Sequence, residues 1–418
     1  NDGSDTLSGH KSTTYTVSGA NLTNQTADNT ISTEGKYTAT VTTYDNVSNS
    51  STRNYTINID KTAPTTVAPT ASTTTNSITV SNKQTDALSG IASVQYALYN
   101  GSSWSSWQSS NTFTGLTTNK VYKVKTKTKD KAGNSSESAE TSVTTTTLTA
   151  GTLTMKLGNS SGSTYTSGAW TNQNVYVTLN KATTGTTTYE SVTGSAQTIA
   201  SGTTAASTVS TEGTTTLKVK TTDGTNTVED KYYVFVDKTA PTVSPVKSTT
   251  TNTITVTANA SDKDSGVKSV TYKLKNENGD EISTNTTGKF ENLKDNTKYK
   301  IEIIVIDNAG NTTTTTIDAT TKELTIGKLD FTEVTSKDVI PAIKTNPQTN
   351  DEKVWTNENV NVKLTKSSTG TTTYTVTKVG GTTSSAYSAD TQIATTDGDY
   401  VVTITTTDGT NTKTESYY

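Results

Sequence analysis

The sequence predicts an all-β chain made of β-sandwiches in tandem, and three observations support this class. A period of 177 residues separates Asp60–Pro64 from its letter-for-letter copy, Asp237–Pro241. Short runs such as Tyr122–Thr128 alternate apolar or threonine side chains with lysine, which is typical of half-buried strands. No stretch has the i, i+3, i+4 apolar spacing of a helix. We therefore predict tandem immunoglobulin-like sandwiches in an extended array.

Two different units alternate within one period. The first, unit A, begins at Pro64 and at Pro241. Its copies share a strand-like run at a spacing of 176 residues, Ser77–Val80 and Thr253–Val256, and their later matches are spaced by 177. The matched pairs at the longer spacing are Leu116 and Leu293, Tyr122 and Tyr299, Asp130 and Asp307, Gly133 and Gly310, and Asn134 and Asn311. One residue of slippage indicates a single loop insertion within one fold.

The second, unit B, has copies that are 185 residues apart. Trp170–Val175 returns as Trp355–Val360, and Asp223–Asn226 returns as Asp408–Asn411. The run Ser32–Gly35 aligns with Ser210–Gly213, and Tyr417–Tyr418 aligns with Tyr232–Tyr233. We therefore expect both ends to lie within B units of a longer natural chain.

These matches predict five domains. They are a partial B unit truncated at its N-terminus (1–60), an A unit (61–147), a B unit (148–237), an A unit (238–322) and a B unit without its last strand (323–418).

Unit A contains a hairpin signal. The run Thr297–Ile303 precedes Asp307–Asn311, which is followed by Thr312–Ile317. Glycine supplies a positive-φ position in such a turn, and asparagine or aspartate tolerates one nearby. We predict two antiparallel strands joined at this turn.

A leucine followed six residues later by tyrosine occurs in both A units, as Leu116 with Tyr122 and Leu293 with Tyr299. This pattern resembles the corner of fibronectin type III modules. The resemblance implies that the tyrosine ring closes the end of a sandwich and that its hydroxyl bonds nearby backbone.

Unit B resembles the bacterial immunoglobulin-like repeats of Gram-positive surface proteins. The resemblance rests on its Trp-Thr-Asn-x-Asn-Val run, its Glu-Gly pair before a later strand and its Asp-Lys-Thr-Ala-Pro exit. Domains of this kind serve as stalks of adhesins, as spacers in secreted carbohydrate-active enzymes and as decorations of phage tails. The resemblance implies an extracellular location, on a bacterial surface or secreted.

Composition excludes several classes of function. The chain has no cysteine, which excludes disulfides and thiolate chemistry and favours a bacterial over an animal origin. The net charge is −3, and lysines are interspersed with acids, so we expect no nucleic-acid partner. No apolar run approaches the ~18 residues of a membrane-spanning helix.

We expect no catalytic residues and no cofactor. The only histidine is His10, in a polar segment that predicts a solvated loop. Acidic residues repeat with the fold, whereas an enzyme would have one site. An enzyme is expected only as a neighbouring domain elsewhere in a longer chain.

Two groups of carboxylates were weighed as calcium ligands. Asp262 and Asp264 lie in one loop, but their counterpart in the first A unit keeps only Asp86. The second group joins the pairs Asp130 with Asn134 and Asp307 with Asn311 to the exit residues Asp60 and Asp237. Turn residues of these types usually bond their own backbone, and Lys61 and Lys238 oppose a cation. We expect no metal unless distant loops converge.

Trp104 and Trp107 are the one speculative ligand site, a stacking platform for sugar. Their odd spacing would place them on opposite faces of a regular strand, so we expect one to cover the core. Trp170 and Trp355 open equivalent strands and are expected in the core.

These features predict a structural role. We expect a semi-rigid extracellular stalk whose partners are neighbouring domains of the same longer chain, presenting an adhesive or catalytic domain. The alternative is a glycan- or host-protein-binding array, as in an adhesin or a phage tail fibre. Strands of about seven residues make each sandwich roughly 35 to 40 Å long, so four to five units would span on the order of 150 Å.

Overall fold

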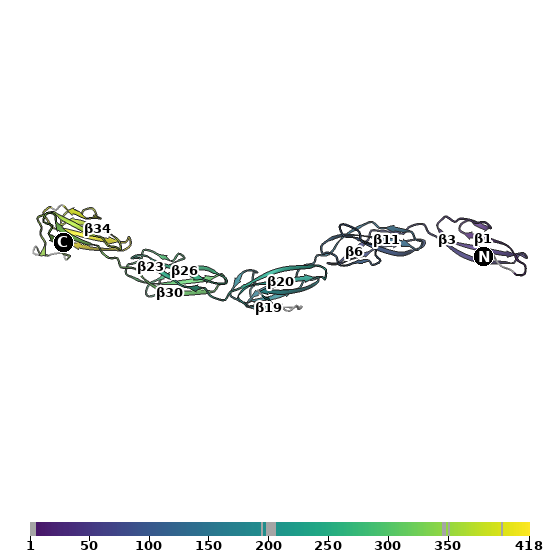
Figure 1. Cartoon of the computed structure of the whole chain (residues 1–418), viewed down its shortest axis with the longest axis horizontal. Coiled ribbons are helices and arrows are strands. Elements are labelled where there is room, and N and C mark those ends of the chain that lie inside the picture. Colours follow the sequence, from purple (N-terminus) through teal and green to yellow (C-terminus); the bar gives the residue numbers. More distant parts are fainter. Residues whose placement is uncertain (1–5, 194, 198–205, 345–347, 350–351, 394–395) are drawn as a thin grey trace. The chain divides into compact units, whose positions relative to one another are not determined.

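The computed structural model describes residues 6–193, 195–197, 206–344, 348–349, 352–393 and 396–418. Within these ranges the regular elements are β-strands, as Figure 1 shows, and they contain no α-helix. The predicted all-β class is confirmed. In the part of the chain that is described, no helix is long and apolar enough to cross a membrane.

Backbone packing divides the chain into two units. Unit 1 contains Asn1–Thr154, Thr178–Ala206 and Thr216–Tyr232, and unit 2 contains Met155–Val177, Ser207–Thr215 and Tyr233–Tyr418. For the described residues, each sheet takes its strands from only one of the five predicted domains. We use those ranges below as names for segments of the chain.

Segment 1–60 forms one four-stranded sheet with the order β2-β1-β3-β4. Its strands are β1 (His10–Ser18), β2 (Leu22–Gln25), β3 (Gly35–Asp45) and β4 (Ser50–Ile59). Val17, Tyr37 and Ala39 are its buried core.

Segment 61–147 has sheets with the orders β10-β7-β6, β12-β11-β13 with β9 also paired to β11, and β5-β8. Its strands are β5 (Thr65–Thr66), β6 (Thr70–Thr73), β7 (Ile78–Ser81), β8 (Gln84–Thr85), β9 (Ile91–Tyr99), β10 (Thr112–Phe113), β11 (Val121–Asp130), β12 (Ser135–Glu137) and β13 (Thr141–Thr144). Ile78, Val80 and Val124 are fully buried between the sheets.

Segment 148–237 has sheets with the orders β14-β16-β19 and β15-β21-β20-β17-β18. Its strands are β14 (Thr152–Leu157), β15 (Trp170–Thr171), β16 (Val175–Asn180), β17 (Thr186–Thr193), β18 (Ser195–Gln197), β19 (Ala206–Val209), β20 (Gly213–Thr222) and β21 (Thr227–Val236). The short strand β15 pairs in parallel with β21.

Segment 238–322 repeats the A architecture, with sheets ordered β22-β25, β23-β24-β28 and β27-β26-β29-β30. Its strands are β22 (Thr242–Val243), β23 (Val246–Thr249), β24 (Ile254–Thr257), β25 (Ala260–Ser261), β26 (Val267–Lys275), β27 (Glu281–Asn285), β28 (Lys289–Phe290), β29 (Lys298–Asp307) and β30 (Thr312–Thr320). The predicted hairpin is confirmed as β29 and β30, with Gly310 at a φ of 97°.

Segment 323–418 has sheets with the orders β32-β31-β33-β35 and β34-β36-β37. Its strands are β31 (Lys328–Glu333), β32 (Val339–Ile340), β33 (Val360–Thr365), β34 (Thr371–Lys378), β35 (Thr391–Ile393), β36 (Tyr400–Thr407) and β37 (Thr412–Tyr417). Tyr374 and Ile404 are fully buried in its core.

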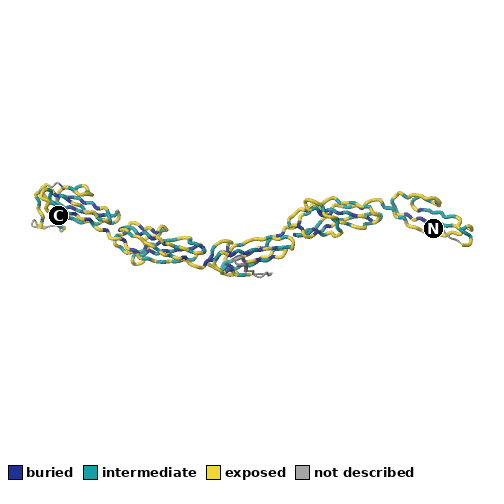
Figure 2. The backbone as a smooth tube through the Cα atoms, viewed as in Figure 1, coloured by how far each residue is buried: buried dark blue, intermediate teal, exposed yellow. Residues whose placement is uncertain are grey.

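Threonine contributes to both faces of the sheets. Figure 2 shows buried and exposed positions alternating along the strands. Some of the inward positions are threonines, and the hydroxyls of Thr372 and Thr406 bond each other at 3.0 Å inside segment 323–418. Because a buried hydroxyl with a partner is tolerated in a core, these sandwiches form with only 29% hydrophobic residues.

The tyrosine corner of both A segments is confirmed. Tyr122 and Tyr299 are 4% and 7% exposed. Their hydroxyls accept the backbone N–H of Thr117 at 2.9 Å and of Lys294 at 3.2 Å. The ring therefore closes the sandwich end, and the hydroxyl fixes the loop that precedes it.

Candidate functional site

The repeated Asp-Lys-Thr-Ala-Pro segment is held on one side by a glutamate of the preceding segment. In unit 2, Glu212 Oε1 accepts the backbone N–H of Lys238 at 2.7 Å and the Thr239 hydroxyl at 3.1 Å. Lys238 Nζ donates to the Ser210 carbonyl at 2.9 Å. In unit 1 the same bonds join Lys61 and Thr62 to Glu34 and Ser32. The linker lysine is thereby turned toward the backbone of the preceding segment.

The other side of the same linker is held by the following A segment. Asp237 Oδ2 accepts the backbone N–H of Ser265 at 2.9 Å, and Asn311 Nδ2 donates to the Asp237 carbonyl at 2.9 Å. The Thr313 hydroxyl donates to the Pro241 carbonyl at 2.6 Å. In unit 1 the equivalent donors to Asp60 and Pro64 are Ser89, Asn134 and Ser136. We call this arrangement, in either copy, the linker joint.

Three carboxylates converge at each linker joint. Asp60, Asp86 and Asp130 form one group and Asp237, Asp262 and Asp307 the other, with one oxygen from each within 4.8 Å of the others. The sequence argument counted ligands loop by loop, so it missed that the linker supplies the third acid.

Most of these acids also serve turn backbone, as the sequence predicted. Asp307 Oδ1 accepts the N–H groups of Gly310 and Asn311 at 2.6 and 2.8 Å. A side-chain hydrogen bond from Ser89 lowers the pKa of Asp60. Burial would raise the pKa of Asp237, but hydrogen bonds from Ser265 lower it overall. Both carboxylates are therefore charged at neutral pH.

Such a group could supply three carboxylate ligands, against the six to eight oxygens that calcium usually takes. The convergence removes one ground for the expectation that no metal binds, and that expectation stays a prediction. Its test is melting of chelator-treated protein with and without calcium. A rise in the melting temperature of segments 61–147 and 238–322 would overturn it.

A second joint lies where each A segment meets the turn of the following B segment. In unit 1, Asn226 Nδ2 donates to the Leu116 carbonyl at 2.9 Å, and Asn226 Oδ1 accepts the Thr118 N–H at 3.1 Å. Asn76 Nδ2 donates to the Asp223 carbonyl at 3.0 Å. We call this arrangement the turn joint.

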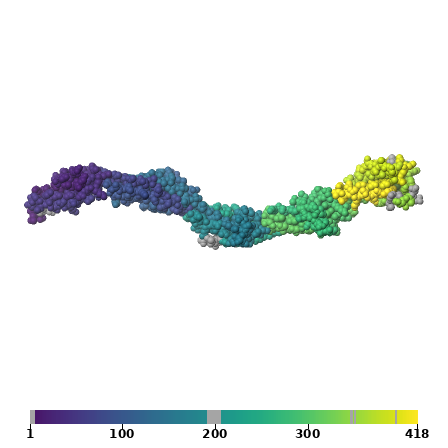
Figure 3. All heavy atoms as spheres, turned by 180° about the vertical axis from the view of Figure 1, so that it is seen from behind, coloured from purple at the N-terminus to yellow at the C-terminus, as the bar shows by residue number. Residues whose placement is uncertain are grey.

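Unit 2 repeats the turn joint. Asn411 bonds the Leu293 carbonyl at 3.0 Å and the Asp295 N–H at 3.2 Å, and Asn252 donates to the Asp408 carbonyl at 3.0 Å. Figure 3 shows the two segments meeting where green gives way to yellow. The loop that carries Leu293 is the one that the Tyr299 hydroxyl fixes from inside.

The aspartates of the turn joint are strongly acidic. Burial would raise the pKa of Asp223, but the backbone N–H of Asn226 and the Thr75 side chain outweigh it and lower the pKa to about 2. Asp408, with Thr251 and Asn411, likewise has a pKa of about 2. Thr75 and Thr251 are buried residues of the neighbouring A segments.

These shifts predict how the turn joint depends on pH. A folded-state pKa below the usual 3.8 stabilises the fold above pH 4, and this contribution is lost as the pH falls toward about 2. We expect the double variant Asp223→Asn, Asp408→Asn to melt below the unmodified protein at pH 5. The difference should shrink progressively between pH 4 and pH 2, as calorimetry would measure. A difference that does not change with pH would show that charge is irrelevant there.

The expectation for Trp104 and Trp107 was wrong in one respect. Residues 104–107 do not form a regular strand, and the spacing rule therefore does not apply. Lys125 Nζ lies 4.7 Å from the Trp104 ring centroid and 5.1 Å from that of Trp107. Both indoles thus lie over the same lysine, and neither is in the buried core.

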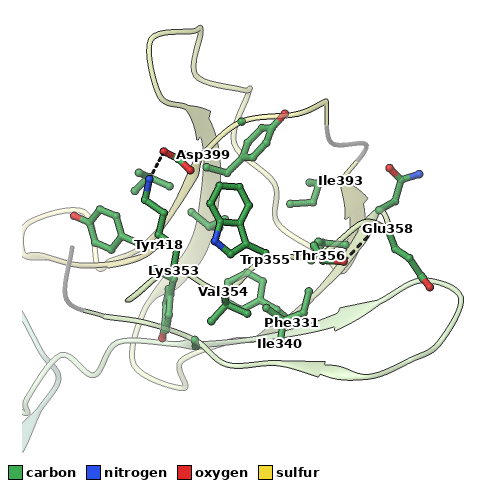
Figure 4. A pocket seen from close by; sticks show the side chains of 18 of the residues that line it. Phe331, Ile340, Lys353, Val354, Trp355, Thr356, Glu358, Ile393, Asp399 and Tyr418 are labelled. Carbon is green, nitrogen blue, oxygen red and sulfur yellow. Dashed lines mark hydrogen bonds and ion pairs between the residues drawn. The ribbon is translucent and has the colours of Figure 1, made fainter. Parts of the chain in front are cut away.

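The expectation of a core position is wrong for Trp355 and is met in part by Trp170. Trp170 is half-buried and lies 5.3 Å from Phe235 by ring centroids. Trp355 is 64% exposed. It lines a cavity of about 690 Å³ together with Phe331, Ile340, Val354 and Tyr418, as Figure 4 shows.

His10 is exposed, as predicted, but it is the first residue of β1, not a loop residue. Its Nε2 lies 2.9 Å from the Thr13 hydroxyl.

No family model matches the chain, and no curated protein matches it. Similar solved structures include the chicken CNTN1 FN1–FN3 domains, at 15% identity over 62% of this chain and 100% of that one, with a TM-score of 0.22. Three N-terminal domains of the Hoc capsid protein of bacteriophage RB49 match at 10% identity over 63% and 100%, with a TM-score of 0.36. The fibronectin(III)-like modules of CbhA from Clostridium thermocellum match at 20% identity over 41% and 95%, with a TM-score of 0.22.

Proposed function

We propose that this chain is a structural spacer, the semi-rigid stalk of a bacterial surface or secreted protein that presents an adhesive or catalytic domain. The observation that carries the proposal is that both kinds of joint occur twice with the same side chains in the same bonds. Residues repeated for packing alone would lie in the cores, whereas Asn226, Asn411, Glu34 and Glu212 lie at joints.

The joints limit motion because their bonds are short and come from both sides. A linker of five residues is bonded to the preceding segment through Glu212 and to the following one through Ser265 and Asn311. Pro241 also fixes its own φ. A free linker would let neighbouring domains reorient, which is the usual behaviour of small polar interfaces.

Small-angle X-ray scattering tests the spacer proposal. We expect a maximum dimension on the order of 150 Å, from sandwiches of roughly 35 to 40 Å each. A maximum dimension typical of a compact globule of this mass would contradict the proposal.

A binding role for Trp104 and Trp107 is the second candidate, because two indoles share one exposed face of segment 61–147. Lys125 and Lys127 lie over these rings, and Lys125 is also paired with Glu137 at 3.0 Å. A glycan would have to displace these lysines to stack on the indoles. Glycan titration followed by tryptophan fluorescence, with Trp104→Ala and Trp107→Ala as controls, distinguishes this role from a purely structural one.

A further inference from the structure

The cavity beside Trp355 has a filled counterpart in segment 148–237. There, Trp170 and Thr171 form β15, which pairs in parallel with Phe235 and Val236 of β21. The aromatic rings of Trp170 and Phe235 lie 5.3 Å apart by centroids, so the strand covers the indole.

Further contacts hold the end of β21 in place. The backbone N–H of Asp237 donates to the Thr171 carbonyl at 2.9 Å, which extends the pairing beyond the last residue of the strand. Val234 and Val236 are fully buried. The end of β21 therefore completes both the sheet and the core of segment 148–237.

A backbone bond also holds the chain at the entrance to each site. In segment 148–237, the Gly168 N–H donates to the Tyr233 carbonyl at 2.9 Å. In segment 323–418, the Tyr418 N–H donates to the Ile343 carbonyl at 2.9 Å. Tyr418 aligns with Tyr233 in the repeat, so both tyrosines lie where the chain enters the site.

Beyond this point the two segments differ. Among the described residues of 323–418, none takes the place of Val234–Val236, and Trp355–Thr356 does not form a strand. The wall is largely apolar, with Phe331, Ile340, Ile393 and Val402, and Val354 is 40% exposed on it. The cavity thus has the lining of a sandwich core without the strand that covers it in the sister segment.

We propose that this groove binds one extended β-strand with the apolar pattern of Val234-Phe235-Val236, paired in parallel with Trp355 and Thr356. Backbone bonds to residues 355–356 would set the register, and the aromatic residue would stack on Trp355, as Phe235 does on Trp170. Addition of a strand to an open edge is a recurrent mode of peptide binding, in which side-chain pockets give specificity. The inference goes beyond the spacer function, because it assigns a binding surface to one segment.

The test uses the complete chain and a synthetic peptide with the sequence of residues 234–241. We expect the peptide to shift tryptophan emission to shorter wavelength, as burial of the Trp355 ring requires. A control peptide with serine in place of Val234, Phe235 and Val236 should bind at least about tenfold more weakly. The variant Trp355→Ala should lose the emission shift, and the matched variant Trp104→Ala should keep it.

A second measurement keeps the inference falsifiable if the free peptide binds too weakly to detect. Residues Val-Phe-Val-Asp appended directly after Tyr418 should raise the melting temperature of segment 323–418, because attachment gives a high effective concentration. An appended Ser-Ser-Ser-Asp should not. Equal effects of the apolar and serine sequences would overturn the proposal. Concentration-dependent dimerisation that buries Trp355 without peptide would instead assign the groove to a second copy of the chain.

Discussion

Replacing Tyr299 with alanine is expected to destabilise segment 238–322 by about 3 kcal/mol, through the cavity left by the ring and the loss of its hydrogen bond. The side chain is 7% exposed, and its hydroxyl holds the Lys294 N–H at 3.2 Å. Calorimetry should show one transition moving to lower temperature while the others persist, since the stability of an array is largely local.

Two further variants separate the ring from the hydroxyl. Tyr299→Phe keeps the ring and should cost only about 1 kcal/mol. Tyr55→Ala removes a tyrosine that is 48% exposed and should leave the melting profile unchanged. A Tyr299→Ala profile identical to that of the unmodified protein would contradict the corner assignment.

Replacing Asn226 with alanine is expected to loosen the turn joint of unit 1 without unfolding either neighbouring segment. The change removes the bonds to the Leu116 carbonyl and the Thr118 N–H. Both groups can then be hydrated at the segment end, so the loss is about 1 to 3 kcal/mol of coupling between the segments. It should not appear as a loss of core stability.

The absence of cysteine makes this measurable. The substitutions Ser102→Cys and Asp230→Cys place spin labels at two exposed positions on either side of the joint. We expect a narrow distance distribution in this background and a broad one when Asn226→Ala is added. Asn278→Ala, at an exposed position in segment 238–322, is the matched control and should leave the distribution narrow. Equal widths for all three proteins would show that Asn226 does not restrain the joint.

Much of the fold could be predicted because the information is local and repeated. Alternation along Tyr122–Thr128 predicts β11, and the leucine and tyrosine six residues apart predict a corner whose hydroxyl bond the structure contains. The Asp307–Asn311 turn satisfies its own backbone, as short polar turn residues do.

The joints could not be predicted, because their bonds join residues far apart in sequence. Asn226 is 110 residues from Leu116, and Asp60 is 74 residues from Asn134. The signal was nevertheless present, since Glu34, Asp223 and Asn226 all lie in motifs that return in the next B unit. Their repetition was interpreted as a mark of fold, although none of these residues is apolar.

The tryptophans failed for a different reason. Spacing predicts which face a residue takes only within a regular strand, and residues 104–107 lie outside one. Trp170 and Trp355 have the same local sequence but different cover, because the cover of Trp170 comes from Phe235, about sixty residues later.

The two joints together encode an order of domains. The turn joint needs an A corner loop followed by the Asp-Gly-Thr-Asn turn of a B segment, and the linker joint needs a B glutamate followed by an A serine and asparagine. Neither joint can form between two adjacent A segments or two adjacent B segments. Gene duplication that copies one A and one B together therefore lengthens the chain with every joint intact, whereas duplication of a single domain creates a mismatched junction. Spacer length in such a protein can change in steps of one whole pair.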